Sequence, residues 1–221
     1  PNLYYQNNFV GTLNLVNEML RNDLDKLVFS STAAIFGNPV TEKIAENHPK
    51  NPINPYGQSK LMIENMLQDI CLAYNFNAIC LRYFNAAGAH PLAEIGEAHD
   101  PETHLIPNIL KSAKSNDINL NVFGDDYPTY DGTCIRDFVH VTDLSEAHLL
   151  ALDKLNNNKG FMAFNLGNGD GYSVLDVIKC CEKITNIKIK YNVANRRIGD
   201  PAILVADNDL SKSILNWTPK N

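Results

Sequence analysis

Residues 26–33 read Lys26-Leu27-Val28-Phe29-Ser30-Ser31-Thr32-Ala33, a short apolar run that ends in three hydroxyl side chains. An apolar run of this length is typical of a strand buried on both faces of a parallel sheet. The hydroxyl groups fall at its carboxyl end, and open α/β sheets bind their ligands at that edge. The stretch therefore predicts a parallel sheet with a binding site at the end of this strand.

A helix with two functional side chains is predicted downstream. Tyr56 and Lys60 are four residues apart, so they share one face of a helix. Pro55, directly before them, suits the first turn of that helix. A tyrosine with a pKa of about 10 is a poor base near neutral pH, but a neighbouring ammonium and a cationic cofactor favour its phenolate. The pair predicts a base that removes a proton from a hydroxyl group, with an ordinary surface helix as the alternative.

The rest of the chain alternates between strand and helix patterns, which indicates an α/β fold with a parallel sheet. The expected helices cover residues 5–21, 56–75, 105–115, 143–155, 173–185 and 209–215. The expected strands cover residues 27–31, 78–84, 120–123, 137–141, 161–166 and 187–191. The glycine-rich segment 167–171 is interpreted as a turn, because no acidic residue follows it on a later strand as in a dinucleotide-binding motif.

Composition excludes several classes of function. With 221 residues, 44% of them hydrophobic, the chain can bury the core of one large or two small domains. A net charge of −6 argues against nucleic acid or an anionic membrane as a partner, and no apolar run approaches the ~20 residues of a membrane span. The five cysteines show no Cys-x-x-Cys and no spacing with histidine that suggests zinc. We therefore expect no metal site and a reducing, cytoplasmic location.

Segments along nearly the whole chain resemble the extended short-chain dehydrogenase/reductase family, and within it the enzymes that epimerise UDP-sugars at C4. These segments are residues 5–12, 29–37, 55–60, 81–91, 123–129, 131–141, 165–167 and 196–202. The resemblance implies a Rossmann-like, doubly wound parallel sheet with a smaller α/β substrate domain. It assigns residues 1–85 to the remainder of an NAD-binding domain, to which 137–170 return, and residues 86–221 to a UDP-sugar-binding domain.

The dinucleotide fingerprint of that family, Gly-x-x-Gly-x-x-Gly after a first strand, is not found in this sequence. We therefore expect the sheet to be incomplete and the chain to be a fragment that lacks this N-terminal part. On this interpretation the fragment alone is predicted to be inactive.

The resemblance implies an NAD-dependent epimerase that interconverts UDP-glucose and UDP-galactose through a 4-keto intermediate. The residues that match its catalytic positions are Tyr56, Lys60 and Thr32. Those that match its cofactor positions are Asn8, Ser30, Thr32, Tyr56, Lys60, Tyr83 and Phe84. Those that match its substrate positions are Asn85, His104, Leu105, Phe123, Arg136, Arg197, Asp200 and Leu204.

The implied substrate positions have distinct roles. Arg136 and Arg197 match diphosphate-binding positions, and a planar guanidinium can hold two phosphate oxygens at once. Phe123 matches a residue that packs on uracil, and Asp200 one that accepts hydrogen bonds from the nucleotide ribose. Leu204 lies where relatives limit the room beside the sugar C2 substituent, but a leucine is intermediate in size and does not distinguish hexoses from N-acetylated sugars.

Other functions stay open at this point. Ala33-Ala34 stand where the sugar dehydratases of the family carry Asp-Glu, so dehydration is disfavoured. The alternatives are a UDP-N-acetylhexosamine or UDP-pentose 4-epimerase, and a non-catalytic homologue that binds nucleotide sugars. The family is usually homodimeric through helices such as the one at 56–75, and we expect a homodimer here.

Overall fold

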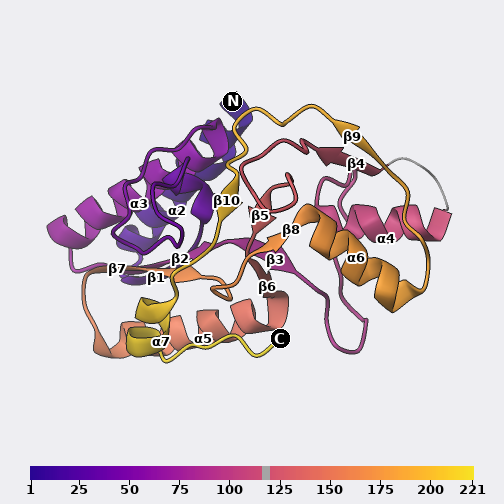
Figure 1. The fold of residues 1–221 in the computed structure, drawn as a ribbon. Helices are drawn as coiled ribbons and strands as arrows, with labels where there is room; N and C mark the ends of the chain where they lie inside the picture. The colour runs from indigo at the N-terminus through magenta and orange to yellow at the C-terminus, as the bar shows by residue number, and fades with distance from the viewer. Residues whose placement is uncertain (116–119) are drawn as a thin grey trace.

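The computed structural model describes residues 1–115 and 120–221, and its centre is a three-stranded parallel sheet between layers of helices (Figure 1). The strand order is β1 (Lys26–Thr32), β2 (Asn77–Tyr83) and β7 (Phe161–Leu166). Thr32 pairs with Tyr83, and Tyr83 with Leu166, so the three strands end together. The predicted α/β fold with a parallel sheet is confirmed, and the hydroxyl-rich end of β1 lies at its carboxyl edge.

Helices cover both faces of this sheet because alternate residues of β2 point to opposite sides. Ala78 and Cys80 pack with α2 (Gly11–Arg21) and α3 (Pro55–Ala73). Ile79 and Leu81 pack with α5 (Val141–Asn157) on the other face. The chain reaches α2 through α1 (Asn2–Tyr4) and the π-helix Tyr5–Val10, so the predicted helix over 5–21 is helical throughout but begins in a wider form.

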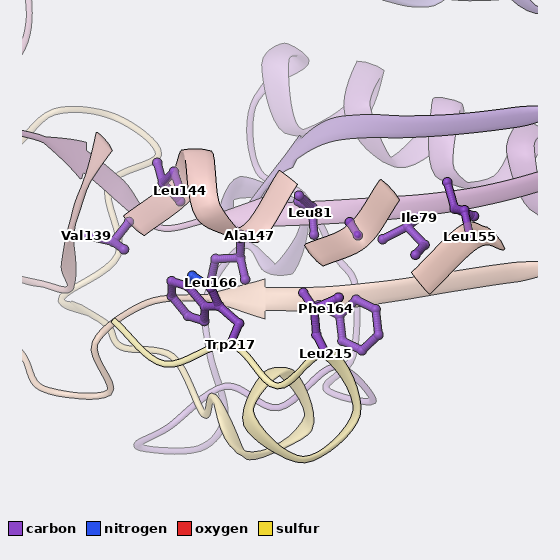
Figure 2. Packing of buried hydrophobic residues seen from close by; sticks show 11 residues of the cluster. Ile79, Leu81, Val139, Leu144, Ala147, Leu155, Phe164, Leu166, Leu215 and Trp217 are labelled. Carbon is purple, nitrogen blue, oxygen red and sulfur yellow. The ribbon is translucent and has the colours of Figure 1, made fainter. Parts of the chain in front are cut away.

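The core between the sheet and α5 also holds the end of the chain. Trp217 is fully buried beside Leu166 and Leu215, as Figure 2 shows, and its indole Nε1 donates a hydrogen bond to the carbonyl of Asp143 at 2.8 Å. Leu215 belongs to α7 (Asp209–Leu215). Residues 209–217 thus pack on the three-stranded sheet, next to the segment 137–170 that was expected to belong to the NAD-binding domain. The division of the chain into two domains stays a prediction.

A second, smaller core lies beyond the carboxyl edge of the sheet (Figure 1). The helices α4 (Leu105–Ser115) and α6 (Val174–Thr185) pack with β4 (Leu120–Phe123), which pairs in parallel with β9 (Tyr191–Ala194). Its buried side chains are Ile109, Ala113, Leu120, Val122, Ile178, Cys181 and Ile189.

Short strands connect the two cores. The strands β3 (Asn85–Ala87) and β6 (Phe138–His140) pair in parallel, directly after the end of β2. A second small sheet has the order β10 (Ile203–Leu204), β5 (Ile135–Arg136) and β8 (Tyr172–Ser173). Since Leu204 pairs with Arg136 in this sheet, two predicted site residues are fixed side by side.

The expected elements at 105–115, 120–123, 161–166 and 209–215 coincide with α4, β4, β7 and α7. The expected strand at 187–191 is wrong: β9 begins at Tyr191, because its partner β4 begins opposite that residue. Ile189 is instead held by a hydrogen bond of 2.9 Å from its backbone N–H to the Glu182 carboxylate. None of the helices within residues 1–115 and 120–221 combines the length and the apolar character that crossing a bilayer requires.

Candidate active site

The first turn of α3 places Tyr56 at the end of β1. The Asn54 side chain caps the helix by accepting a hydrogen bond from the backbone N–H of Gly57 at 2.8 Å, and Pro55 occupies the first turn. Gly57 is needed because a Cβ atom at this position would lie 2.4 Å from the carbonyl oxygen of Ala34. The close contact lets the first turn of α3 press against the segment after β1, which places Tyr56 beside Thr32, whose side chain lowers the pKa of the phenol.

Thr32 is held by its own position in the chain. It ends β1 and caps the 3₁₀-helix Ala33–Phe36, where its hydroxyl accepts a hydrogen bond from the Ala34 N–H at 3.2 Å. The threonine is buried, and a hydroxyl group so held has a defined orientation toward the phenol. The structure therefore places two of the three predicted catalytic residues, Tyr56 and Thr32, on the wall of the same cavity.

Lys60, one turn after Tyr56, points to the same strand end. Its Nζ donates a hydrogen bond of 2.8 Å to the carbonyl of Ser30 and lies 4.6 Å from the centre of the Phe29 ring. It is 6.0 Å from the centre of the Tyr56 ring. Burial lowers the pKa of this ammonium, because the charged form loses hydration.

Burial raises the pKa of Tyr56, the Thr32 side chain acts in the opposite direction, and the nearby Tyr4 raises it further. The Nζ atom of Lys60 is turned to the Ser30 carbonyl rather than to the phenol. The expectation that Lys60 together with a cationic cofactor favours the phenolate stays a prediction.

Two predicted cofactor residues form a hydrogen-bonded chain that the sequence analysis did not foresee. The Tyr83 hydroxyl lies 2.7 Å from Ser30 Oγ and 2.6 Å from Nε2 of His148 on α5. His148 Nδ1 donates to the Leu144 carbonyl at 2.8 Å, so in the neutral ring Nε2 accepts the proton of Tyr83. Nothing in the sequence pattern singles out His148, because its contact with Tyr83 spans 65 residues.

Asn8 lies on the far side of α3. Its side-chain amide donates to the Ser59 hydroxyl at 3.0 Å, and that hydroxyl donates to the carbonyl of Tyr56 at 2.8 Å. Asn8 thus contacts the helix that carries the phenol and supports its first turn.

A cavity of about 950 Å³ lies at the carboxyl edge of the sheet and extends to the second core. This volume is at the upper end of the range for small-molecule sites, roughly 300–1,000 Å³. The predicted site residues that line it are Thr32, Tyr56, Tyr83, Phe84, Asn85, His104, Leu105, Phe123, Arg136, Arg197 and Asp200. Three predicted cofactor residues, Asn8, Ser30 and Lys60, do not line this cavity. Leu204 lines an adjoining cavity of about 200 Å³ together with Thr32 and Asp200.

Arginine side chains supply positive charge in the cavity away from Tyr56. The guanidinium of Arg136 donates to Asp200 Oδ1 at 2.6 Å and to the Ile135 carbonyl at 2.8 Å, which fixes its plane. The Arg197 guanidinium carbon lies 3.9 Å from the centre of the Phe123 ring, a cation–π contact. An aromatic face and two fixed cations suit a ligand that carries both a flat ring and phosphate groups.

The sequence analysis missed a buried network directly behind Thr32. Glu64, on α3, accepts a hydrogen bond from Ser31 Oγ at 2.6 Å and binds Arg82 through both carboxylate oxygens, at 2.9 and 2.7 Å. All three side chains are buried. The available signal was Arg82 itself, because an arginine within an apolar strand requires a buried partner.

Comparison with known proteins agrees with this architecture. The model of the NAD dependent epimerase/dehydratase family matches residues 1–167. The chain belongs to this epimerase/dehydratase family.

Similar members of the epimerase/dehydratase family share both sequence and fold with the chain. The UDP-glucose 4-epimerase of Halalkalibacterium halodurans is 50% identical over 220 residues, which is 100% of this chain and 66% of that protein. The structure of the UDP-glucose 4-epimerase from Bifidobacterium longum in complex with NAD⁺ and UDP has a TM-score of 0.94 and 39% identity, covering 98% of this chain and 65% of that one. The Brucella ovis enzyme in complex with NAD has a TM-score of 0.93 and 43% identity, covering 98% and 66%. The chain thus spans about two thirds of the length of these relatives.

Proposed function

We propose that this chain provides the base and the sugar-nucleotide pocket of an NAD-dependent UDP-glucose 4-epimerase, which interconverts UDP-glucose and UDP-galactose through a 4-keto intermediate. The observation that carries the proposal is one cavity whose wall holds Tyr56 and Thr32 together with Arg136 and Arg197. Membership of the epimerase/dehydratase family and the 50% identity to a UDP-glucose 4-epimerase support it.

The catalytic proposal assigns the proton to Tyr56. Its phenolate oxygen removes the proton of the sugar 4-hydroxyl, and we assign Thr32, on the same cavity wall, to orienting that hydroxyl. Since burial raises the pKa of Tyr56, the phenolate needs additional positive charge. We assign that charge to the Lys60 ammonium, one helical turn away, together with the cationic nicotinamide.

The strand end suits the nicotinamide part of NAD. Lys60 offers an ammonium for ribose hydroxyls, while Tyr83 and Phe84 line the cavity with ring surface that can pack on a planar heterocycle. We assign Ser30 and Asn8 to the support of these groups, since each is bonded to a residue of the pocket wall or its helix. When bound, NAD⁺ supplies the redox chemistry, taking hydride from the sugar C4 and returning it.

The other end of the cavity suits UDP. Arg136 and Arg197 are assigned to the diphosphate, the Phe123 ring to uracil, and Asp200 to ribose hydroxyls. Asn85, His104 and Leu105 line the cavity as well, and we assign them to the sugar and its phosphate. Leu204 lies in the adjoining cavity, and we assign it to the wall beside the sugar C2 substituent.

The assembly and location are also part of the proposal. We assign a homodimer contact to the helical layer of α2 and α3, where Leu15 on α2 and Leu72 on α3 are 52% and 80% exposed and Tyr74, just after α3, is 59% exposed. The free cysteines at 71, 80, 134, 180 and 181 suit a reducing compartment, which for this activity is the cytoplasm.

The test is a panel of UDP-sugars offered to the complete protein with NAD⁺. We expect UDP-galactose and UDP-glucose to interconvert, with slower conversion of a UDP-N-acetylhexosamine and a UDP-pentose, followed by NMR of the anomeric region. Faster conversion of either alternative sugar would move the substrate assignment to it. Binding of UDP-sugars without any conversion, or loss of water from the hexose, would contradict the proposal.

A further inference from the structure

Four metal-ligating side chains converge in the segment before α4, outside the residues assigned to the base. Glu97, His99, Glu102 and His104 each offer one ligand atom, and these four atoms all lie within 4.8 Å of one another. His99 Nδ1 is 2.9 Å from Glu97 Oε1 and 3.7 Å from Glu102 Oε1, and His104 Nδ1 bonds the same Glu97 oxygen. Two imidazoles and two carboxylates thus face a common centre.

Burial distinguishes this cluster from solvated surface charge. The side chain of Glu102 is only 3% exposed, and its Oε2 is fully buried without a hydrogen-bond partner. Lys111 is the nearest cation, but its Nζ is 3.8 Å away and its side chain is largely exposed. The other oxygen, Oε1, lies 3.7 Å from His99 Nδ1 and accepts hydrogen bonds from the backbone N–H groups of Thr103 and His104. A buried carboxylate oxygen without a donor is costly, and a cation bound by both oxygens of Glu102 would remove that cost.

We propose that Glu97, His99, Glu102 and His104 form a binding site for a divalent transition-metal ion of the zinc class. Imidazole nitrogen together with carboxylate oxygen is a donor set that suits such ions. Zinc bonds of about 2.0–2.1 Å place tetrahedral ligands about 3.3 Å apart. The most widely separated ligand atoms, up to 4.8 Å apart, need to approach by roughly 1.5 Å, whereas His99 Nδ1 and Glu97 Oε1, 2.9 Å apart, need to separate slightly. The imidazoles are 56% exposed, which gives the ion a route of access and the side chains room to rotate.

The site has a structural consequence for the cavity. Glu97, Glu102 and His104 line the 950 Å³ cavity, whereas His99 does not. A bound ion would therefore tie residues 97–104 together as one wall of the cavity, and it would do so without contact to Tyr56. The sequence analysis expected no metal because it looked for cysteine and histidine spacings, and this cluster uses carboxylates in place of thiols.

The experiment is a Zn²⁺ titration of the complete protein, stripped of metal with a chelator and measured in competition with a chromophoric zinc indicator. We expect one tight zinc site per chain. His99→Gln and Glu102→Gln should each lower its zinc affinity roughly tenfold or more, because removing even an outer-shell partner of a metal ligand has an effect of this size. His90→Gln is the matched control, since His90 lies in the same segment but outside the cluster. Its zinc affinity should equal that of the parent.

Substitution with Co²⁺ separates this site from the cysteines. The cluster predicts visible d–d absorption without a thiolate-to-cobalt charge-transfer band, because its ligands are nitrogen and oxygen. Three results would each overturn the proposal. The first is a charge-transfer band in the Co²⁺ spectrum, and the second is a zinc affinity that His99→Gln leaves unchanged. The third is a parent protein that binds no more Zn²⁺ than the His99→Gln/His104→Gln variant. Circular dichroism of the variants checks that the fold is retained.

Discussion

Replacing Tyr56 with phenylalanine is expected to lower the turnover of UDP-galactose by roughly 10²–10⁴-fold, the usual contribution of a positioned acid–base group. The substitution removes only the phenol hydroxyl, the proposed base on the cavity wall. The ring, the cap of α3 and the arginines at the other end of the cavity stay in place, so UDP binding should change little. Steady-state rates and UDP titration calorimetry on the complete protein check both expectations.

Tyr4→Phe is the matched control for this variant. The Tyr4 ring lies 5.7 Å from the Tyr56 ring, centre to centre, and is 46% exposed, but Tyr4 does not line the cavity. Removing the Tyr4 hydroxyl should therefore leave the turnover of UDP-galactose unchanged. If Tyr56→Phe turned over as fast as the parent, or if Tyr4→Phe lost as much activity, the base would have to be another group.

Replacing Glu64 with alanine is expected to destabilise the folded state by about 3–5 kcal/mol, the cost of leaving one partner of a buried ion pair alone. Arg82 is 2% exposed and bonds both carboxylate oxygens of Glu64, so the variant would bury an uncompensated guanidinium. Ser31 would lose its acceptor as well. Urea unfolding followed by tryptophan fluorescence, at constant pH, measures the change.

The surface pair Glu146 and Lys220 provides the comparison for this variant. Their charged atoms are 2.6 Å apart, but the side chains are 40% and 65% exposed. Glu146→Ala should therefore cost no more than about 1 kcal/mol. A double variant, Glu64→Leu with Arg82→Met, should recover much of the stability lost in Glu64→Ala, because it leaves no charge buried. Equal effects of Glu64→Ala and Glu146→Ala would contradict the assigned role of the buried pair.

The elements with strong local signals were predictable from the sequence. The apolar run of β1 with its hydroxyl end, the proline and asparagine at the start of α3, and the long periodic helices each follow from a few neighbouring residues. Strands of two or three residues such as β5 and β10 were missed, because they are too short for a period to emerge. β9 was placed too early because its register is set by β4, some 70 residues away, and not by its own alternation.

The candidate site, too, was only partly predictable from the sequence. Tyr56, Lys60 and Thr32 were found from local spacing and from resemblance, and they meet at one strand end. The contacts of His148 with Tyr83 and of Glu64 with Arg82 are tertiary, so no local pattern contains them. Spacing places Lys60 on the correct face of α3, but it does not reveal that the Lys60 Nζ bonds the Ser30 carbonyl or that burial raises the pKa of Tyr56.

We propose that the sugar loses a proton from its 4-hydroxyl oxygen and a hydride from C4, and that this hydride returns to C4. The most direct measurement is conversion of UDP-galactose that carries deuterium at C4, using the complete protein in ordinary water and NMR of the product. The account predicts UDP-glucose with the deuterium retained at C4. Loss of the deuterium to solvent, or its appearance at another carbon, would contradict it.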